Sequence, residues 1–368
     1  MNEYSELTGT EAPGNLTALE QLRARIGDVM RVDNAQVEVD RAVAFSGQLI
    51  VGAEEAFDKL KARFDELGYI PLLRENETGQ KQVIVAIKGK LQSAFAERRW
   101  LNALLFAATV VTTTLFGGMY ASRVQAGQSL PTLHIIIQYG LPFSIALLAI
   151  LGVHELGHYI QARRHALPVT LPYFVPVPFG LGTFGAFIQM RGAVENKRAL
   201  FDVGAGGPIA GLLVALPLFV AGLLMSTVSN LPPPLHRSLL IDGLIALFRP
   251  DAMANGILLN PVLLAARFGL IITAVNLLPV GQLDGGHIAY AALGRRWAAW
   301  IGYATIAVMA VLGLTVSTTW FVWMGFALLS GVHHIAPLND ITPLDTRRNA
   351  AFLVTAVLFL SLFSAQPF

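Results

Sequence analysis

The chain has 368 residues, of which 54% are hydrophobic and only 14% are charged, and its mean hydropathy is +0.57. Soluble domains carry about 25% charged residues, so this composition excludes an ordinary soluble protein and indicates a membrane protein. The formal net charge of +2 gives no support to nucleic acid as a partner. The chain has no cysteine, which excludes disulfides and thiolate ligands, so any metal must be bound by His, Asp or Glu.

The first hundred residues predict a soluble domain. Residues 1–16 have the polar composition of a disordered tail. They contain no apolar stretch typical of a signal peptide, and their acidity does not resemble a plastid transit peptide. Residues 17–97 predict a small α+β domain in which nothing indicates catalysis. Its predicted elements are a strand at 42–51, a helix at 53–68 ended by Gly68, and a hairpin of strands at 69–75 and 81–89.

Residues 98–368 predict a multi-pass α-helical membrane domain with about seven spans, because a bilayer core of about 30 Å needs runs of this length. The apolar runs lie near 100–120, 142–163, 203–225, 261–280, 298–315, 319–335 and 350–366. Cytoplasmic loops are enriched in Lys and Arg, and a cytoplasmic N-terminal domain places five basic pairs on the cytoplasmic side. These pairs are Arg98–Arg99, Arg163–Arg164, Lys197–Arg198, Arg295–Arg296 and Arg347–Arg348. We therefore expect a protein of the cell membrane, in contact with the lipid bilayer, whose N-terminal domain is cytoplasmic.

Two segments of the membrane domain are irregular. Residues 167–192 are apolar but rich in Pro and Gly, so they cannot form a regular spanning helix. The alternation in GTFGAFIQM (182–190) predicts a membrane-embedded strand or re-entrant segment, and irregular backbone at that depth must be buried in protein or line a cavity. The second segment, PVGQLDGGH (279–287), interrupts an apolar helix around Asp284.

The segment LGVHELGHYIQARRH (151–165) carries ionisable residues within a predicted span, where such residues are costly and mark functional sites. His154 and His158 are four residues apart, so a helix places both on one face, where they can bind one metal ion. Glu155 is turned away from that face and is better placed to reach a water molecule bound to the metal. This is the HExxH arrangement of zinc peptidases. A hydrogen-bonded polar seam or a proton relay is the alternative interpretation.

A catalytic zinc site built on two histidines needs a third protein ligand and leaves one position for water. Asp284 is the best candidate, because it is the only acid between Ala252 and Leu338 and the two following glycines allow close backbone approach. His287 is the rival ligand. N-capping of the following helix is the alternative role of Asp284.

HELGH (154–158) and NLLPVGQLDGG (276–286) together resemble the HExxH and NxxPxxxLDGG motifs of the site-2 protease family of intramembrane zinc metalloproteases. The resemblance extends through GTFGAFIQMR and FDVGAGGPIAG and covers most of residues 98–340. It is closest to the cyanobacterial and chloroplast subgroup with a soluble N-terminal domain.

The resemblance implies that His154, His158 and Asp284 bind one Zn²⁺ per chain. It also implies that Glu155 is catalytic and that Asn276 contacts the substrate or the developing oxyanion, although an interhelical hydrogen bond is the alternative role of Asn276. The implied activity is cleavage of transmembrane helices of membrane-anchored protein substrates near the cytoplasmic side, as in regulated intramembrane proteolysis. A transporter without metal and an inactive zinc-binding scaffold are the other functions considered, and the intact glutamate argues against the scaffold.

A substrate helix must unwind before its peptide bonds become accessible, and we expect the predicted strand to pair with the extended substrate by β-addition. The residues expected to pair are Gly182, Thr183, Phe184, Gly185, Ala186 and Phe187. A purely structural hairpin is the alternative.

The segment GAGGPIAG (204–211) is interpreted as close helix packing. His333 and His334 are interpreted as a solvated pair at a helix end.

Overall fold

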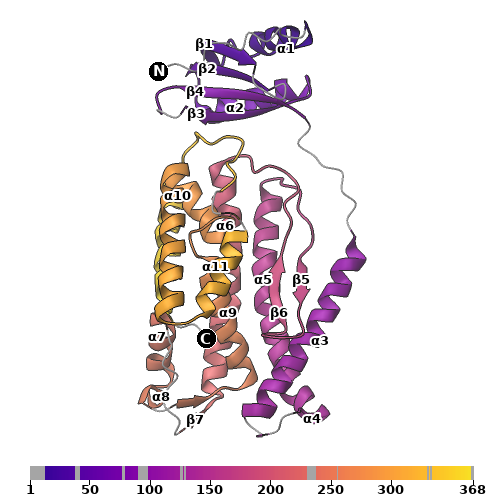
Figure 1. The fold of residues 1–368 in the computed structure, drawn as a ribbon, viewed down its shortest axis with the longest axis vertical. Coiled ribbons are helices and arrows are strands. Elements are labelled where there is room, and N and C mark those ends of the chain that lie inside the picture. Colours follow the sequence, from indigo (N-terminus) through magenta and orange to yellow (C-terminus); the bar gives the residue numbers. More distant parts are fainter. Residues whose placement is uncertain are drawn as a thin grey trace. The chain divides into compact units, whose positions relative to one another are not determined.

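The computed structural model describes residues 13–37, 42–76, 79–89, 98–124, 127, 130–229, 238–254, 256–329, 331 and 334–365. The chain folds as two compact units (Figure 1). The first comprises residues 1–93 together with two short segments, 193–197 and 336–343, and the second comprises 94–192, 198–335 and 344–368. Most of the predicted tail at 1–16 lies outside the described residues, but the first helix already begins at Pro13.

The first unit is an antiparallel four-stranded sheet of order β1-β2-β4-β3 with two helices. The elements are α1 (Pro13–Ala24), β1 (Met30–Val37), β2 (Val43–Leu49), α2 (Ala53–Asp65), β3 (Tyr69–Glu75) and β4 (Gln82–Lys88). Helix α2 buries Ala56, Phe57, Leu60 and Phe64, which recur at helical spacing and form its core with the sheet. Gly68 ends this region with φ +74°, a conformation that favours glycine. The sequence analysis predicts neither α1 nor β1.

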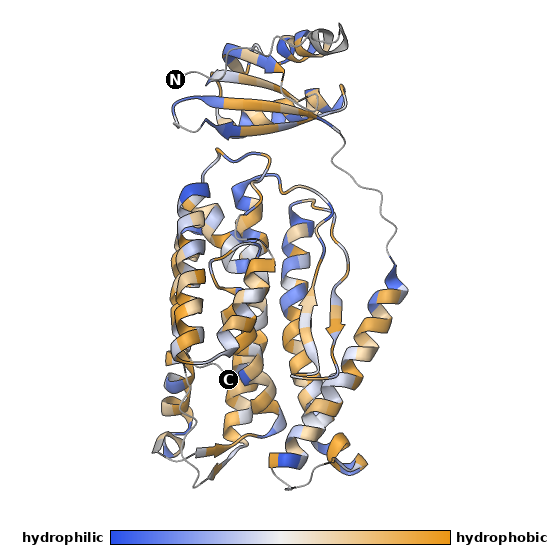
Figure 2. Cartoon of the chain, viewed as in Figure 1, coloured by the Kyte–Doolittle hydropathy of each residue, from blue (hydrophilic) through white to orange (hydrophobic). Residues whose placement is uncertain are grey.

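The second unit is mainly helical. Its helices are α3 (Arg99–Val124), α4 (Leu133–Ile135), α5 (Leu141–Arg164), α6 (Lys197–Leu224), α7 (Leu239–Phe248), α8 (Asp251–Ala254), α9 (Pro261–Asn276), α10 (Asp284–Thr315), α11 (Thr319–Leu329) and α12 (Thr346–Leu362), and a π-helical turn at Ile136–Gly140 joins α4 to α5. Among the described residues, four helical segments have the length and apolar composition needed to cross a bilayer: Arg99–Val124, Leu133–Arg164, Lys197–Leu224 and Asp284–Thr315. Figure 2 shows that these helices are hydrophobic along most of their length.

This arrangement confirms a helical protein with membrane-length apolar helices and a small N-terminal domain built on a sheet. It does not establish seven spans. The predicted runs at 261–280, 319–335 and 350–366 form helices of 16, 11 and 17 residues. A regular helix of that length covers less than the roughly 20 residues that a span needs.

The irregular segment after α5 forms a hairpin of β5 (Tyr173–Pro176) and β6 (Thr183–Phe187). A second, short hairpin pairs β7 (Thr227–Ser229) with β8 (Gly256–Leu258). The predicted strand GTFGAFIQM is therefore shorter than expected, because β6 ends at Phe187. The register shifts between Phe174 and Pro176 on β5, and Gly185 on β6 has φ +100°. A bulge of this kind requires a residue without a side chain.

Candidate metal centre

Helix α5 presents His154 and His158 on one buried face. Their exposed fractions are 3% and 7%, and their Nε2 atoms lie 3.1 Å apart. This placement follows from the helical period, since residues four apart are neighbours on one face. The Nδ1 of His158 lies 2.7 Å from the backbone carbonyl of Val203 on α6, and donation to this oxygen leaves Nε2 free to bind a metal.

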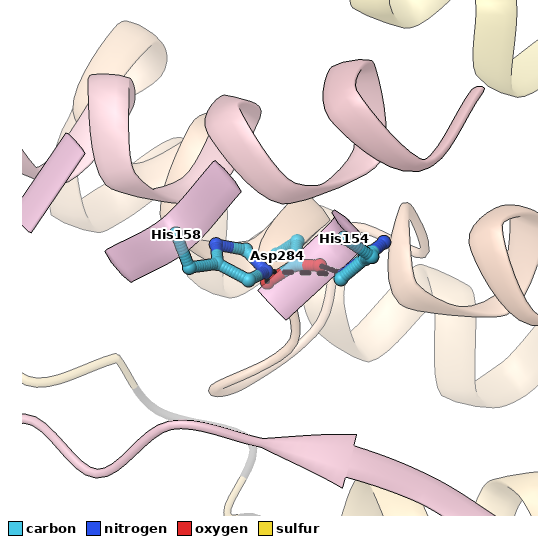
Figure 3. Close-up of side chains that lie close together, drawn as sticks. All are labelled: His154, His158 and Asp284. Carbon is cyan, nitrogen blue, oxygen red and sulfur yellow. Dashed lines mark hydrogen bonds and ion pairs between the residues drawn. The ribbon is translucent and has the colours of Figure 1, made fainter. Parts of the chain in front are cut away.

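Asp284 is the first residue of α10 and lies against both imidazoles (Figure 3). One carboxylate oxygen is 3.2 Å from His154 Nε2 and the other is 3.3 Å from His158 Nε2. The N-cap position belongs to Leu283, so capping is not the role of Asp284. A Cβ on Gly285 would lie 2.1 Å from the carbonyl oxygen of Leu277, so this turn can fold back on itself only with glycine there.

The donor set fits a zinc ion. The ligand atoms of His154, His158 and Asp284 all lie within 4.8 Å of one another, and all three side chains are shielded from solvent. Atoms that bind tetrahedral zinc at about 2.0–2.1 Å are about 3.3 Å apart, which is close to the 3.1 to 3.3 Å observed here. Two imidazoles and one carboxylate leave one tetrahedral position open, as in catalytic zinc sites.

A cavity of about 220 Å³ opens beside these three side chains. Glu155 lines it and is only 5% exposed, and Ile188 lines it as well. Asn276, the last residue of α9, also lines the cavity, and its Nδ2 is 3.4 Å from His154 Nε2. The structure therefore brings together all five side chains that the two motifs single out, around a space that can admit a substrate group.

Residues 142–316 match the family model described as peptidase family M50. This segment contains both motifs and all five of these side chains. The chain carries an M50 peptidase domain.

Several curated proteins are similar to this chain over most of its length. "Probable zinc metalloprotease EGY2, chloroplastic" of Arabidopsis thaliana is 30% identical over 91% of this chain and 62% of its own length. "Probable zinc metallopeptidase EGY3, chloroplastic" of the same plant is 25% identical over 87% of this chain and 60% of its own length. "Probable zinc metalloprotease EGY1, chloroplastic" of Oryza sativa subsp. japonica is 32% identical over 60% of this chain and 40% of its own length. The chain thus spans about three fifths or less of these relatives, and no solved structure matches it.

In the M50 domain, the imidazole rings of the two histidines pack against glycines of α6. A Cβ on Gly207 would lie 2.1 Å from His158 Nε2, and one on Gly211 would lie 3.1 Å from His154 Nδ1. The two glycines are four residues apart, like the histidines, so each faces one imidazole ring. The sequence analysis interprets this segment as helix packing alone. The matching spacing of HxxxH and GxxxG is the signal that would have indicated its second role.

The predicted substrate strand is only partly at the cavity. Ala186 and Phe187 line it, whereas Phe184 is 57% exposed and its ring packs edge-to-face against Phe326 of α11. The carbonyl of Gly182 instead accepts a 2.6 Å hydrogen bond from Thr112 on α3. The Thr183 hydroxyl donates to Val175 on β5, and Gly185 occupies the bulge. Within its two-stranded sheet β6 pairs only with β5, so one edge has no strand partner among the described residues.

His287 lines the cavity but is not part of the three-residue donor group. Its Nδ1 is hydrogen-bonded to Nε2 of His334, and the His334 ring lies 4.6 Å from the ring of Tyr290. The interpretation of His334 as a solvated residue is therefore wrong, because it is half-buried and held by two side chains. His333 lies outside the described residues.

Proposed function

We propose that this protein is a zinc-dependent intramembrane endopeptidase. The observation that carries the proposal is the convergence of His154, His158 and Asp284, with Glu155 and an open cavity beside them. The membrane-length helices that carry or precede these residues and the M50 domain support the same conclusion. The proposed substrates are membrane-anchored proteins whose transmembrane helices are cleaved near the cytoplasmic side.

The chain's own residues have distinct tasks in peptide hydrolysis. His154, His158 and Asp284 would hold Zn²⁺, which when bound supplies the Lewis acidity that polarises a peptide carbonyl and acidifies a water molecule. The Glu155 carboxylate would accept the proton of that water and deliver it to the departing amide nitrogen. The Asn276 amide would donate a hydrogen bond to the carbonyl oxygen as negative charge develops there. The surrounding helices keep bulk water out of the site, which strengthens each of these interactions.

Pairing of the substrate with β6 is part of the proposal. An extended peptide laid along the open edge of β6 would run past Ala186 and Phe187, both of which line the cavity. Main-chain hydrogen bonds would then replace those lost when the substrate helix unwinds. Ile188, the residue that follows β6, lines the same cavity as Glu155, which supports this placement.

We further propose about seven spans in the cell membrane, with the first unit in the cytoplasm. The basic pairs support this orientation. Arg98–Arg99 stands at the start of α3, Arg163–Arg164 ends α5, and Lys197–Arg198 begins α6. Positively charged ends on one side of successive helices are the usual determinant of orientation.

The direct test is Glu155→Gln in the full chain reconstituted with a membrane-anchored model substrate. Removing the proton acceptor should lower cleavage by at least a hundredfold, within the range of general acid–base contributions, while zinc content stays at the wild-type level. A matched control is Glu54→Gln in the soluble unit, which should cleave at the wild-type rate. Undiminished cleavage by Glu155→Gln would contradict the proposal, whereas zinc binding without any wild-type cleavage would favour the inactive scaffold.

A further inference from the structure

The edge strand β3 of the first unit pairs with a segment that lies between α11 and α12 in the sequence, and this segment pairs with a second one that directly precedes α6. The backbone of Leu73 donates to the carbonyl of Leu338 at 2.7 Å and accepts from the N–H of Asp340 at 2.9 Å. The segment 338–340 pairs in turn with 194–196, since Leu338 and Asn339 donate to the carbonyls of Val194 and Glu195 at 2.9 and 2.8 Å. Residues 338–340 and 194–196 thus extend the sheet in parallel beyond β3. We call them the docked segments.

Side chains also anchor the docked segments. Leu338 is 5% exposed and belongs to the hydrophobic core of the first unit, together with residues of α2 and the sheet. Asn339 is 2% exposed, and its amide donates to the carbonyl of Ala53 on α2 at 3.4 Å and to the hydroxyl of Thr342 at 2.8 Å. Lys61 of α2 forms an ion pair with Glu195 at 2.9 Å. These segments cover the edge of β3, which would otherwise offer unpaired backbone groups to other chains.

Both docked segments are close in sequence to residues that contact the metal-binding side chains. The segment 194–196 is followed at once by α6, whose Val203 carbonyl and Gly207 seat His158. The segment 338–340 is preceded by His334, four residues before Leu338, and His334 is bonded to His287. His287 lies one helical turn after Asp284 in α10. The edge of β3 is therefore connected through the chain to two contacts of the metal centre. One is the contact of α6 with His158 of α5, and the other is the contact of His334 with His287 of α10.

We propose that the soluble unit is a regulatory clamp that keeps the metal centre competent. While β3 holds the docked segments, it restrains the chain that leads into α6 and the chain that follows His334, and through them the contacts of His158 and Asp284. Release of the segments frees both ends and loosens the donor set. An extended peptide that competed for the edge of β3 would act through the same contacts and switch the site off. For its cleavage readout alone, the inference rests on the proposed function.

The test opens the clamp without touching the metal centre. Leu338→Asp places a charge in the core of the first unit, and the milder Asn339→Ala removes the buried amide that holds the turn. Ile50→Asp is the matched control, because Ile50 belongs to the same unit but is 57% exposed. Amide hydrogen exchange at Leu73 and Asp340 reports release of the segments in the full chain. Zinc affinity is measured by competition with a chelator, and cleavage is measured on the membrane-anchored model substrate.

We expect both clamp variants to bind zinc at least tenfold more weakly than wild type, with cleavage reduced by at least tenfold, while Ile50→Asp behaves as wild type. If Leu338→Asp unfolds the whole unit, Asn339→Ala decides by the same thresholds. Zinc affinity and cleavage within twofold of wild type in both clamp variants would overturn the inference. If zinc affinity falls as expected but the wild-type protein cleaves nothing, the clamp stands and the proposed protease function fails.

Discussion

At the scale of single residues, the metal centre depends on glycines, whose lack of a side chain leaves room for the metal-binding histidines. The imidazole rings of His154 and His158 occupy volume that any side chain at Gly211 or Gly207 would fill. The close approach of α5 and α6 has the same origin, because a Cβ on Gly157 would meet the backbone oxygen of Gly206 at 2.3 Å. Small residues at this interface let the two backbones approach as packed transmembrane helices do.

Gly207→Ala should therefore weaken zinc binding without removing a ligand. The added methyl group would lie 2.1 Å from His158 Nε2, so the ring must move. Overpacking of this kind costs about 1–3 kcal/mol, which corresponds to a zinc affinity about fivefold to 150-fold lower. Gly325→Ala in α11 is the control, since its Cβ would meet nothing within 4 Å. Equal zinc affinities for both variants, measured by chelator competition, would contradict the seating role of α6.

The sequence predicts the ligands well because their spacing is a local property of one helix. HExxH places two imidazoles on one face of α5 whatever surrounds it. Asp284 can be predicted because it is the sole acid in a long apolar stretch. The seat at Gly207, and the contact between His287 and His334, depend on how separate elements pack. Neither contact can be predicted from the periodicity of a single segment. A family resemblance identifies the motifs but not the contacts that they make.

At the scale of elements, hydropathy predicts where helices occur but not how far they extend. Helix α11 has only 11 residues although the apolar run there is longer. Strand β1 escapes prediction for a different reason. Its apolar residues alternate as Met30 and Val32 and then as Ala35 and Val37, and the register shift between Val32 and Asn34 interrupts the pattern that reveals a strand. Strand β6 is predicted in place, but it covers only Thr183–Phe187 of the predicted stretch 182–190.

Phe184→Pro tests whether β6 binds substrate. Proline removes a backbone N–H at the strand, so an extended substrate would lose a main-chain partner, and we expect cleavage to fall about tenfold with zinc still bound. Phe184→Leu keeps the N–H and should cleave within about twofold of wild type, which separates backbone pairing from loss of the exposed ring. If both variants cleave like wild type, β6 is only a structural hairpin.

At the scale of the whole molecule, a unit built on a four-stranded sheet and a mainly helical unit with membrane-length helices are combined in one chain. The boundary is not a single linker, because residues 193–197 and 336–343 belong to the first unit although their neighbours in sequence belong to the second. A sequence read in order predicts one N-terminal domain. It cannot predict that two distant loops complete its sheet, because that pairing exists only in three dimensions.

Orientation can be tested directly because the natural chain has no cysteine. Ile50→Cys labels the first unit, and Leu130→Cys, 76% exposed, labels the connection between α3 and α4. In intact cells that express each variant, we expect a membrane-impermeant thiol reagent to modify position 130 and to reach position 50 only after lysis. The reverse pattern would place the soluble unit outside and contradict the orientation drawn from the basic pairs.

The central claim is that two imidazoles of α5 and the carboxylate at the start of α10 bind a single zinc ion. It is tested most directly by the zinc content of purified wild type, Asp284→Ala and His287→Ala. We predict about one zinc per chain in wild type and in His287→Ala, and less than about a tenth of that in Asp284→Ala, since a site with two histidines needs its third ligand. Full zinc content in Asp284→Ala, or loss of zinc only in His287→Ala, would contradict the account.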